Sequence, residues 1–184
     1  MQERVVLVNK EDELIGLMDK LEAHKKGVLH RAVSVFIFNS NNELLIQRRS
    51  LDKYHTPAMW SNTACSHPRN NESTLSCVNR RLFEEMGIET KIFPIFSFSY
   101  KSEFQNNLIE HELDHVFLGF SDKKLKPNFK EVCSWNYVDE KSLIKLLNDC
   151  PESFSPSFRI CYERVFLKAY EQKNKELIYH EFNI

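Results

Sequence analysis

The segment from Ala32 to Arg49 constrains the fold most, because it has the pattern of two strands joined by a turn. Residues 32–38 are rich in β-branched and aromatic side chains, which is typical of a strand. Residues 39–42 are polar turn formers, and residues 44–46 provide an apolar returning strand. The pattern predicts a β-hairpin that ends at Arg48 and Arg49.

A helix is predicted after this hairpin, at residues 74–86. Its apolar residues recur every three or four positions, which marks one face of a helix, and Gly87 supplies an end. Further strands are expected around residues 96–100 and 113–120, and helices at 142–147 and from Pro156 to about Glu171. A mixed sheet flanked by helices makes the expected fold class α+β. The apolar positions of the first helix are Leu75, Val78, Leu82 and Met86.

Length and composition fit one folded domain that spans residues 1–184. The hydrophobic fraction is 42%, with only four Gly and six Pro, and neither a repeat nor a linker divides the chain. The formal net charge of −1 provides no broad field for nucleic acid or an anionic membrane, so we expect neither as a partner. An anionic ligand would have to be held by a local cluster of cations.

The chain has no apolar run of membrane-spanning or signal-peptide length, so a cytoplasmic protein is expected. Its five cysteines include no CxxC pair, which argues against both a disulfide framework and a thiolate zinc site. Each cysteine is therefore either a packing residue or a functional thiol. Cys77 and Cys161 are expected to be packing residues.

Histidines and carboxylates form a candidate metal site. Alternation along an expected strand puts Glu110 and Glu112 on one face and turns His111 to the other. With three further histidines, the two carboxylates would make a site of nitrogen and oxygen donors suited to Mg²⁺, Mn²⁺ or Zn²⁺. The alternative is that each histidine is an unrelated surface or core residue. These three histidines are His24, His30 and His67.

Residues 66–88 resemble a Nudix box, in which a loop and a helix present carboxylates to a magnesium ion bound to a diphosphate. Glu84 and Glu85 lie in the last turn of the expected helix, where the helix dipole disfavours negative charge. A solvated charged face is the alternative interpretation. Glu72 and Arg80 match the box, but Ser66 replaces its leading glycine. Arg81 replaces the first glutamate of the usual Arg-Glu pair, which argues against diphosphate hydrolysis.

A second resemblance is to the type I isopentenyl-diphosphate isomerases, which have a Nudix fold. It runs from about Val5 to Leu167 and implies an enzyme that interconverts isopentenyl diphosphate and dimethylallyl diphosphate, with a small-molecule prenyl diphosphate as its partner. The matching segments are residues 23–24, 27–32, 44–49, the Trp-Ser-Asn-Thr-Ala-Cys-Ser-His-Pro run at 60–68, and Glu-His-Glu at 110–112.

The resemblance also implies a role for each matched residue. The catalytic divalent ion, Mn²⁺, Mg²⁺ or Zn²⁺, would be held by His24, His30, His67, Glu110 and Glu112. Glu85 would hold a second ion, Mg²⁺, against the substrate diphosphate. Cys65 and Glu112 would act on opposite sides of the substrate alkene, with Tyr100 assisting the carboxylate. The diphosphate would be bound by Lys20, Arg49, Lys53 and Arg81.

The chemistry requires these residue types. Moving a double bond adds a proton at one carbon and removes one from another through a tertiary carbocation, so an acid and a base must flank the substrate. Glu112 can deliver a proton, and Cys65 near a cationic metal site can become a thiolate that accepts one. The sequence leaves open which of the two groups protonates the substrate.

Ser157 departs from the family pattern, because these isomerases usually have a tryptophan after the Ser/Thr-Pro pair that begins the last helix. The face of that ring would stabilise the carbocation. Phe158, Phe154 or Trp60 could replace it, or the substrate could be another allylic or homoallylic diphosphate. Two other functions remain open: a Nudix hydrolase of a nucleoside or prenyl diphosphate, and a catalytically silent binding relative.

Overall fold

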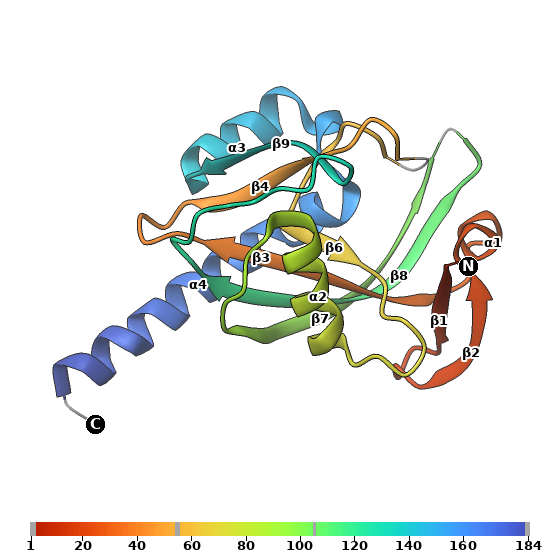
Figure 1. Ribbon diagram of the computed structural model, residues 1–184, viewed down its shortest axis with the longest axis horizontal. Helices are drawn as coiled ribbons and strands as arrows, with labels where there is room; N and C mark the ends of the chain where they lie inside the picture. The colour runs from red at the N-terminus through yellow and green to blue at the C-terminus, as the bar shows by residue number, and fades with distance from the viewer. Residues whose placement is uncertain (1–2, 54–55, 105, 183–184) are drawn as a thin grey trace.

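The computed structural model describes residues 3–53, 56–104 and 106–182, with side chains described as far as Lys175 (Figure 1). The chain order is β1 (Arg4–Val8), β2 (Leu14–Asp19), α1 (Lys20–Lys26), β3 (His30–Phe38), β4 (Leu44–Arg49), β5 (Trp60–Ser61), β6 (Ala64–Ser66), α2 (Thr74–Met86), β7 (Ile92–Glu103), β8 (Ile109–Phe120), β9 (Val132–Val138), α3 (Glu140–Asp149), a 3₁₀ turn (Pro151–Ser153) and α4 (Pro156–Phe182).

The strands form one mixed sheet, with α2 on one face and α3 and α4 on the other. Side chains alternate along β3, so that Val33 and Val35 pack in the core beneath α2 while Phe36 and Phe38 pack in the core beneath α3 and α4. Figure 1 shows α2 in front of the sheet and α4 running behind it and beyond its edge. The predicted α+β fold, a mixed sheet flanked by helices, is confirmed.

The predicted hairpin of β3 and β4 is correct only at the turn that joins the two strands. Phe38 pairs with Leu44, and beyond this pair the two strands separate. The segment 60–66 enters between them, with β6 antiparallel to β3 and β5 antiparallel to β4. The other edge of β3 pairs with β8 in parallel. Cys65, on the inserted segment, therefore pairs with Ser34 of β3.

The first three elements, which the sequence pattern did not predict, form a small unit beside the sheet. β1 and β2 make a hairpin, and β1 reaches β3 through the pair of Leu7 and His30. The Asp19 side chain caps α1 by accepting from the backbone N–H of Glu22, and Gly27 ends the helix at φ 61°. A Cβ atom at Gly27 would lie 3.1 Å from Ile109, so glycine suits both the backbone and the space.

The predicted helices are present with adjusted bounds. α2 matches residues 74–86 and ends at Gly87, which has φ 67°. Val78, Leu82 and Met86 are fully buried, whereas Leu75 is 46% exposed and lies outside the core. α4 continues past the expected end to Phe182. None of the described helices is both long enough and apolar enough to span a membrane.

Candidate active site

One cavity of about 260 Å³ lies where the ends of the sheet meet α1, α2 and the start of α4. It brings together residues from segments that are far apart in the sequence. His30 is fully buried at the histidine cluster next to it. The predicted site residues that line the cavity are Lys20, His24, Arg49, Lys53, Cys65, His67, Arg81, Glu85, Tyr100, Glu110 and Glu112.

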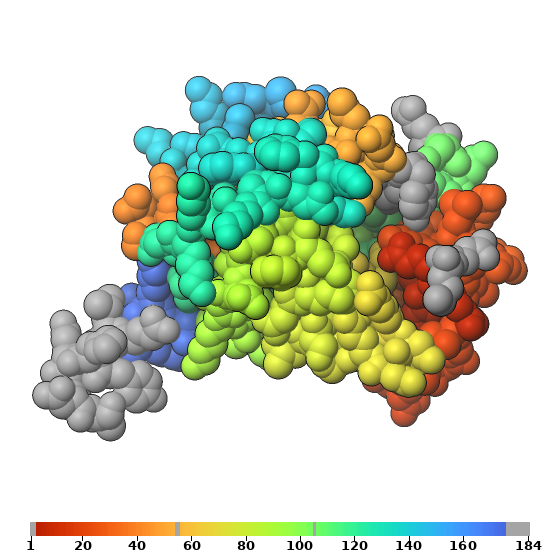
Figure 2. Space-filling view, in the orientation of Figure 1, coloured from red at the N-terminus to blue at the C-terminus, as the bar shows by residue number. Residues whose placement is uncertain are grey.

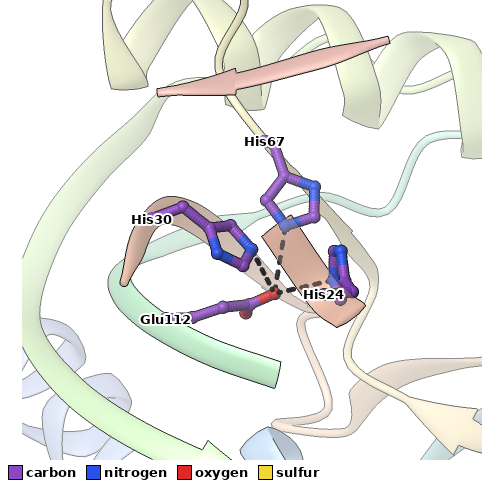
Figure 3. Close-up of side chains that lie close together, drawn as sticks. All are labelled: His24, His30, His67 and Glu112. Carbon is purple, nitrogen blue, oxygen red and sulfur yellow. Dashed lines mark hydrogen bonds and ion pairs between the residues drawn. The ribbon is translucent and has the colours of Figure 1, made fainter. Parts of the chain in front are cut away.

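Three imidazoles converge on one oxygen of Glu112 (Figure 3). The Nε2 atom of His67 lies 3.0 Å from Oε1 of Glu112. The Nε2 atoms of His30 and His24 lie 3.6 Å and 4.0 Å from the same oxygen. The four residues come from α1, the start of β3, the loop after β6 and β8. Each offers a ligand atom within 4.8 Å of the others, so the group could hold a metal ion.

Hydrogen bonds on the outer ring nitrogens orient two of these imidazoles. Nδ1 of His24 lies 2.6 Å from the carbonyl oxygen of Lys20, and Nδ1 of His30 lies 2.8 Å from that of Val28. A carbonyl can only accept, so these contacts assign the ring proton to Nδ1 and leave Nε2 as a lone pair facing the cluster. Nε2 of His30 is buried and lacks a hydrogen-bond partner in the described part of the chain.

The electrostatics of the cluster favour a cation at its centre. Burial lowers the pKa of His67 to about 4 even though Glu112 opposes the shift, so the imidazole is neutral near pH 7. Burial alone would raise the pKa of Glu112, but the nearby imidazoles of His30 and His67 lower it more, so that it lies well below the ordinary value. Imidazole lone pairs facing a carboxylate repel one another unless a positive ion lies between them. The donor set therefore fits a divalent metal ion.

Tyr100 joins the two carboxylates of β8. Its hydroxyl lies 2.7 Å from Oε2 of Glu112 and 3.0 Å from Oε2 of Glu110. Burial, together with the charge of Glu112, raises the pKa of Glu110 to about 8. Glu110 lies outside the group of four close ligand atoms, so its metal role stays a prediction. His111 faces away, with Nδ1 2.9 Å from the Gly27 carbonyl oxygen, as the alternation predicts.

Cys65 reaches the cavity from β6, and Glu112 reaches it from β8 on the other side of β3. Burial raises the pKa of the Cys65 thiol to about 11, although the charge of Arg49, whose Nη1 lies 3.6 Å from the sulfur, opposes this. Without an added cation the residue is a neutral thiol near pH 7. The expected thiolate would therefore need the charge of a bound ion.

Carboxylates surround Arg81 at the other end of the cavity. Its guanidinium nitrogens lie 2.8 Å from oxygens of Glu84, Glu85 and Glu131. Although burial opposes the charged form, Glu85 and Glu131 hold the pKa of Arg81 above its ordinary value. Lys53 also pairs with Glu131, at 2.6 Å. At this end of the cavity the cations of Lys53 and Arg81 are paired with carboxylates, so an anion would compete with those carboxylates for them.

Comparison with known proteins identifies the family. The NUDIX domain family matches residues 28–158. An isopentenyl-diphosphate Delta-isomerase of Burkholderia multivorans is 42% identical over 167 residues, which cover 91% of this chain and 95% of that protein. One of Pectobacterium atrosepticum is 44% identical over 161 residues, which cover 88% of this chain and 90% of that protein.

The chain belongs to the isopentenyl-diphosphate Delta-isomerase family. The resemblance found in the sequence is thereby confirmed, and solved structures agree on the Nudix fold. A crystal structure of a Deinococcus radiodurans protein aligns with a TM-score of 0.67 at 24% identity, covering 80% of this chain and 90% of that one. A MutT protein from Methanosarcina mazei aligns with a TM-score of 0.57 at 23% identity, covering 80% and 96%.

Ser157 lines the cavity of this isomerase-family chain, and none of the three aromatic residues proposed to replace the tryptophan does so. Phe154 and Phe158 are buried in the core beneath α3 and α4, and Trp60 packs against that core. The structure does not favour the alternative that one of these rings replaces the tryptophan, because the rings pack in or against the core. Within the described residues, Tyr100 supplies the one Phe, Tyr or Trp ring in the cavity wall.

Sequence reasoning missed some polar residues at the site. Gln47 donates to Oε2 of Glu85 at 2.6 Å, and its place directly after the apolar residues 44–46 was a usable signal. Ser34 donates to Oδ2 of the buried Asp114 at 2.7 Å. Glu131 lies in the cavity wall between Lys53 and Arg81, and it carries no periodic signal in the sequence.

Proposed function

We propose that the protein interconverts isopentenyl diphosphate and dimethylallyl diphosphate. The observation that carries this proposal is the convergence of three Nε2 atoms on Oε1 of Glu112 while Tyr100 holds Oε2, in a cavity that also contains Cys65. A hydrolase needs neither the thiol nor this cluster. The printed names of the family members agree with the proposed reaction.

The proposed reaction moves one double bond and leaves the oxidation level unchanged. One C–H bond forms at an end of the alkene and another breaks at the allylic carbon, so the proton count is conserved. Cys65 and Glu112 reach the cavity from strands on either side of β3, which suits a substrate lying between them. The Tyr100 hydroxyl can share its proton with Glu112 as the charge on that carboxylate changes.

Divalent metal ions complete the proposed site. A Mn²⁺, Mg²⁺ or Zn²⁺ ion would be held by the three histidines and Glu112, with Glu110 close by, and Glu85 would hold Mg²⁺ together with the diphosphate. When bound, the first ion would supply the positive charge that lowers the pKa of nearby acids. The protein's own part is to orient each donor, as the Nδ1 contacts of His24 and His30 do.

The basic residues would bind the diphosphate and so hold the prenyl part of the substrate in place. Charge-assisted hydrogen bonds from Arg49 and Arg81, and the ammonium groups of Lys20 and Lys53, suit phosphate oxygens. A fixed diphosphate also keeps the carbocation from losing its leaving group. The mostly buried walls around Glu112 limit the water that could trap the cation.

The test is incubation of the purified protein with isopentenyl diphosphate and Mg²⁺, with dimethylallyl diphosphate and released phosphate both measured. The proposal expects the isomer to form and phosphate to stay at the level of a protein-free control. Phosphate release without the isomer would indicate a hydrolase. Binding of the substrate without either product would indicate a catalytically silent relative.

A further inference from the structure

Glu131 is a carboxylate in the cavity wall that the proposed reaction does not use. Its Oε2 atom lies 2.6 Å from Nζ of Lys53 and 2.8 Å from Nη2 of Arg81. One carboxylate oxygen therefore joins the two cations that are expected to bind the diphosphate. Its side chain is 24% exposed, so it borders solvent in the cavity and is not part of the core.

The backbone around Glu131 is fixed. The Ser50 N–H donates to the carbonyl of Glu131, and the Glu131 N–H donates to that of Asn128. The Asn128 N–H donates in turn to the carbonyl of Glu85, so the loop is tied to the end of α2. In the space-filling view the segment before β9 lies directly above α2 (Figure 2). The fold thus holds the backbone of Glu131 at the edge of the cavity, and its side chain reaches Lys53 and Arg81 from there.

We propose that Glu131 is a positioning residue that occupies the anion position between Lys53 and Arg81 until the substrate diphosphate displaces it. This inference rests on the proposed function, because it takes the diphosphate to bind at these two residues. The ammonium and the guanidinium share one oxygen. A phosphate oxygen at that point would accept charge-assisted hydrogen bonds from both cations. A phosphate and a carboxylate within about 4 Å of each other repel, so both cannot occupy that point.

The two cations depend on Glu131 to different degrees. Arg81 also pairs with Glu84 and Glu85, so its guanidinium stays in place when Glu131 loses its charge. For Lys53, the carboxylate partner in the described part of the chain is that of Glu131. Neutralising Glu131 should therefore free the ammonium of Lys53 for an incoming anion without releasing Arg81.

The experiment measures binding of inorganic pyrophosphate to the full-length protein by calorimetry, in buffer with Mg²⁺ and in buffer without added Mg²⁺. Glu131→Gln keeps the side-chain shape and removes the charge, and we expect it to tighten binding about tenfold in both buffers. Glu131→Asp keeps the charge and should bind like the parent. Glu171→Gln is the matched control, because it breaks a lysine–glutamate pair of 2.7 Å on α4 that does not line the cavity.

Kinetics and a second substitution separate this role from a structural one. Glu131→Gln should lower KM for isopentenyl diphosphate and change kcat by less than about twofold. In a Lys53→Met background, Glu131→Gln should lose most of its effect on pyrophosphate affinity, because the freed ammonium is absent. A full effect in that background would contradict the proposal.

Other outcomes also overturn it. If Glu131→Gln binds pyrophosphate more weakly than the parent only when Mg²⁺ is present, Glu131 is a metal ligand. If its affinity equals that of the parent in both buffers, Glu131 does not affect anion binding. If either of these results is found while the parent protein isomerises isopentenyl diphosphate, the proposed role of Glu131 is disproved and the proposed function stands. A parent that neither binds pyrophosphate nor isomerises the substrate disproves the proposed function as well.

Discussion

The Tyr100 hydroxyl lies 2.7 Å from Oε2 of Glu112, whose other oxygen faces the three histidines. The two oxygens of one carboxylate thus have different partners: a proton donor on one side and imidazole nitrogens on the other. A metal ion among the imidazoles would hold the position of Oε1, and Tyr100 would keep a proton next to Oε2. This arrangement suits a carboxylate that exchanges a proton with the substrate without moving.

Tyr100→Phe should lower kcat for isopentenyl diphosphate by about tenfold to a hundredfold, because it removes the proton donor to Glu112. KM should change little, since the hydroxyl bonds to carboxylates and not to the predicted diphosphate residues. Tyr137→Phe is the control, because Tyr137 packs against the core beneath α2 and does not line the cavity. Equal kcat values for the two variants would show that Tyr100 has no role in turnover.

Alanine at His24, His30 or His67 should reduce the divalent metal that copurifies with the protein, because each imidazole contributes one of few donors. Elemental analysis of the single variants measures this directly. His111→Ala is the matched control, since that ring faces away from the cluster. Metal content equal to the parent in all three variants would show that the cluster does not bind the ion.

Asp114 should make the metal-free protein more stable as the pH falls. Burial, with the charge of Glu112, raises its pKa from 3.8 to about 7. Because the folded state binds the proton more tightly, the stabilising contribution is complete below the unfolded pKa and is lost as the pH rises through the folded pKa. From pH 4.5 to 8, the unfolding free energy of the parent should fall by about 3 kcal/mol relative to Asp114→Asn.

Urea unfolding of the parent and of Asp114→Asn at both pH values measures this difference. The comparison cancels the titration of the histidines and other carboxylates that both proteins share. A difference in unfolding free energy that is the same at pH 4.5 and pH 8 would mean that Asp114 keeps an ordinary pKa in the folded protein.

Ser157→Trp should raise turnover of isopentenyl diphosphate, because Ser157 lines the cavity while the nearby phenylalanines are committed to the core. A desolvated cation–π contact is worth about 2 kcal/mol, roughly thirtyfold in rate. Rates on the five-carbon substrate and on longer homoallylic diphosphates provide the measurement. If the variant loses activity on a longer substrate that the parent prefers, Ser157 instead provides space for a longer chain.

Regular patterns allowed much of the fold to be predicted from the sequence. The apolar spacing of α2 and its glycine end gave the correct bounds, and alternation correctly oriented Glu110, His111 and Glu112. β1, β2 and α1 were not predicted, because they are short and carry weak periodicity; α1 has only seven residues. The position of His24 within the cluster depends on these elements packing against the sheet.

Other features of the site depend on contacts that local patterns do not encode. β3 separates from β4 because the segment 60–66 pairs between them, a tertiary contact that local sequence does not encode. This insertion also brings Cys65 into the cavity. The contact of Glu131 with Arg81 joins residues 50 positions apart. Phe158, one of the three rings that could have replaced the tryptophan, packs in the core, and sequence spacing does not distinguish a core ring from a ring in the cavity wall.

The most direct test of the central claim follows isopentenyl diphosphate in deuterium oxide by NMR, with the parent protein, Cys65→Ala and Glu112→Gln. If the two groups transfer the protons, the parent should form dimethylallyl diphosphate that carries solvent deuterium in a methyl group. Each variant should form this product at least about a hundredfold more slowly. Cys150→Ala, which alters an exposed cysteine, should match the parent. Isomer formation at the parent's rate by either Cys65→Ala or Glu112→Gln would contradict the account.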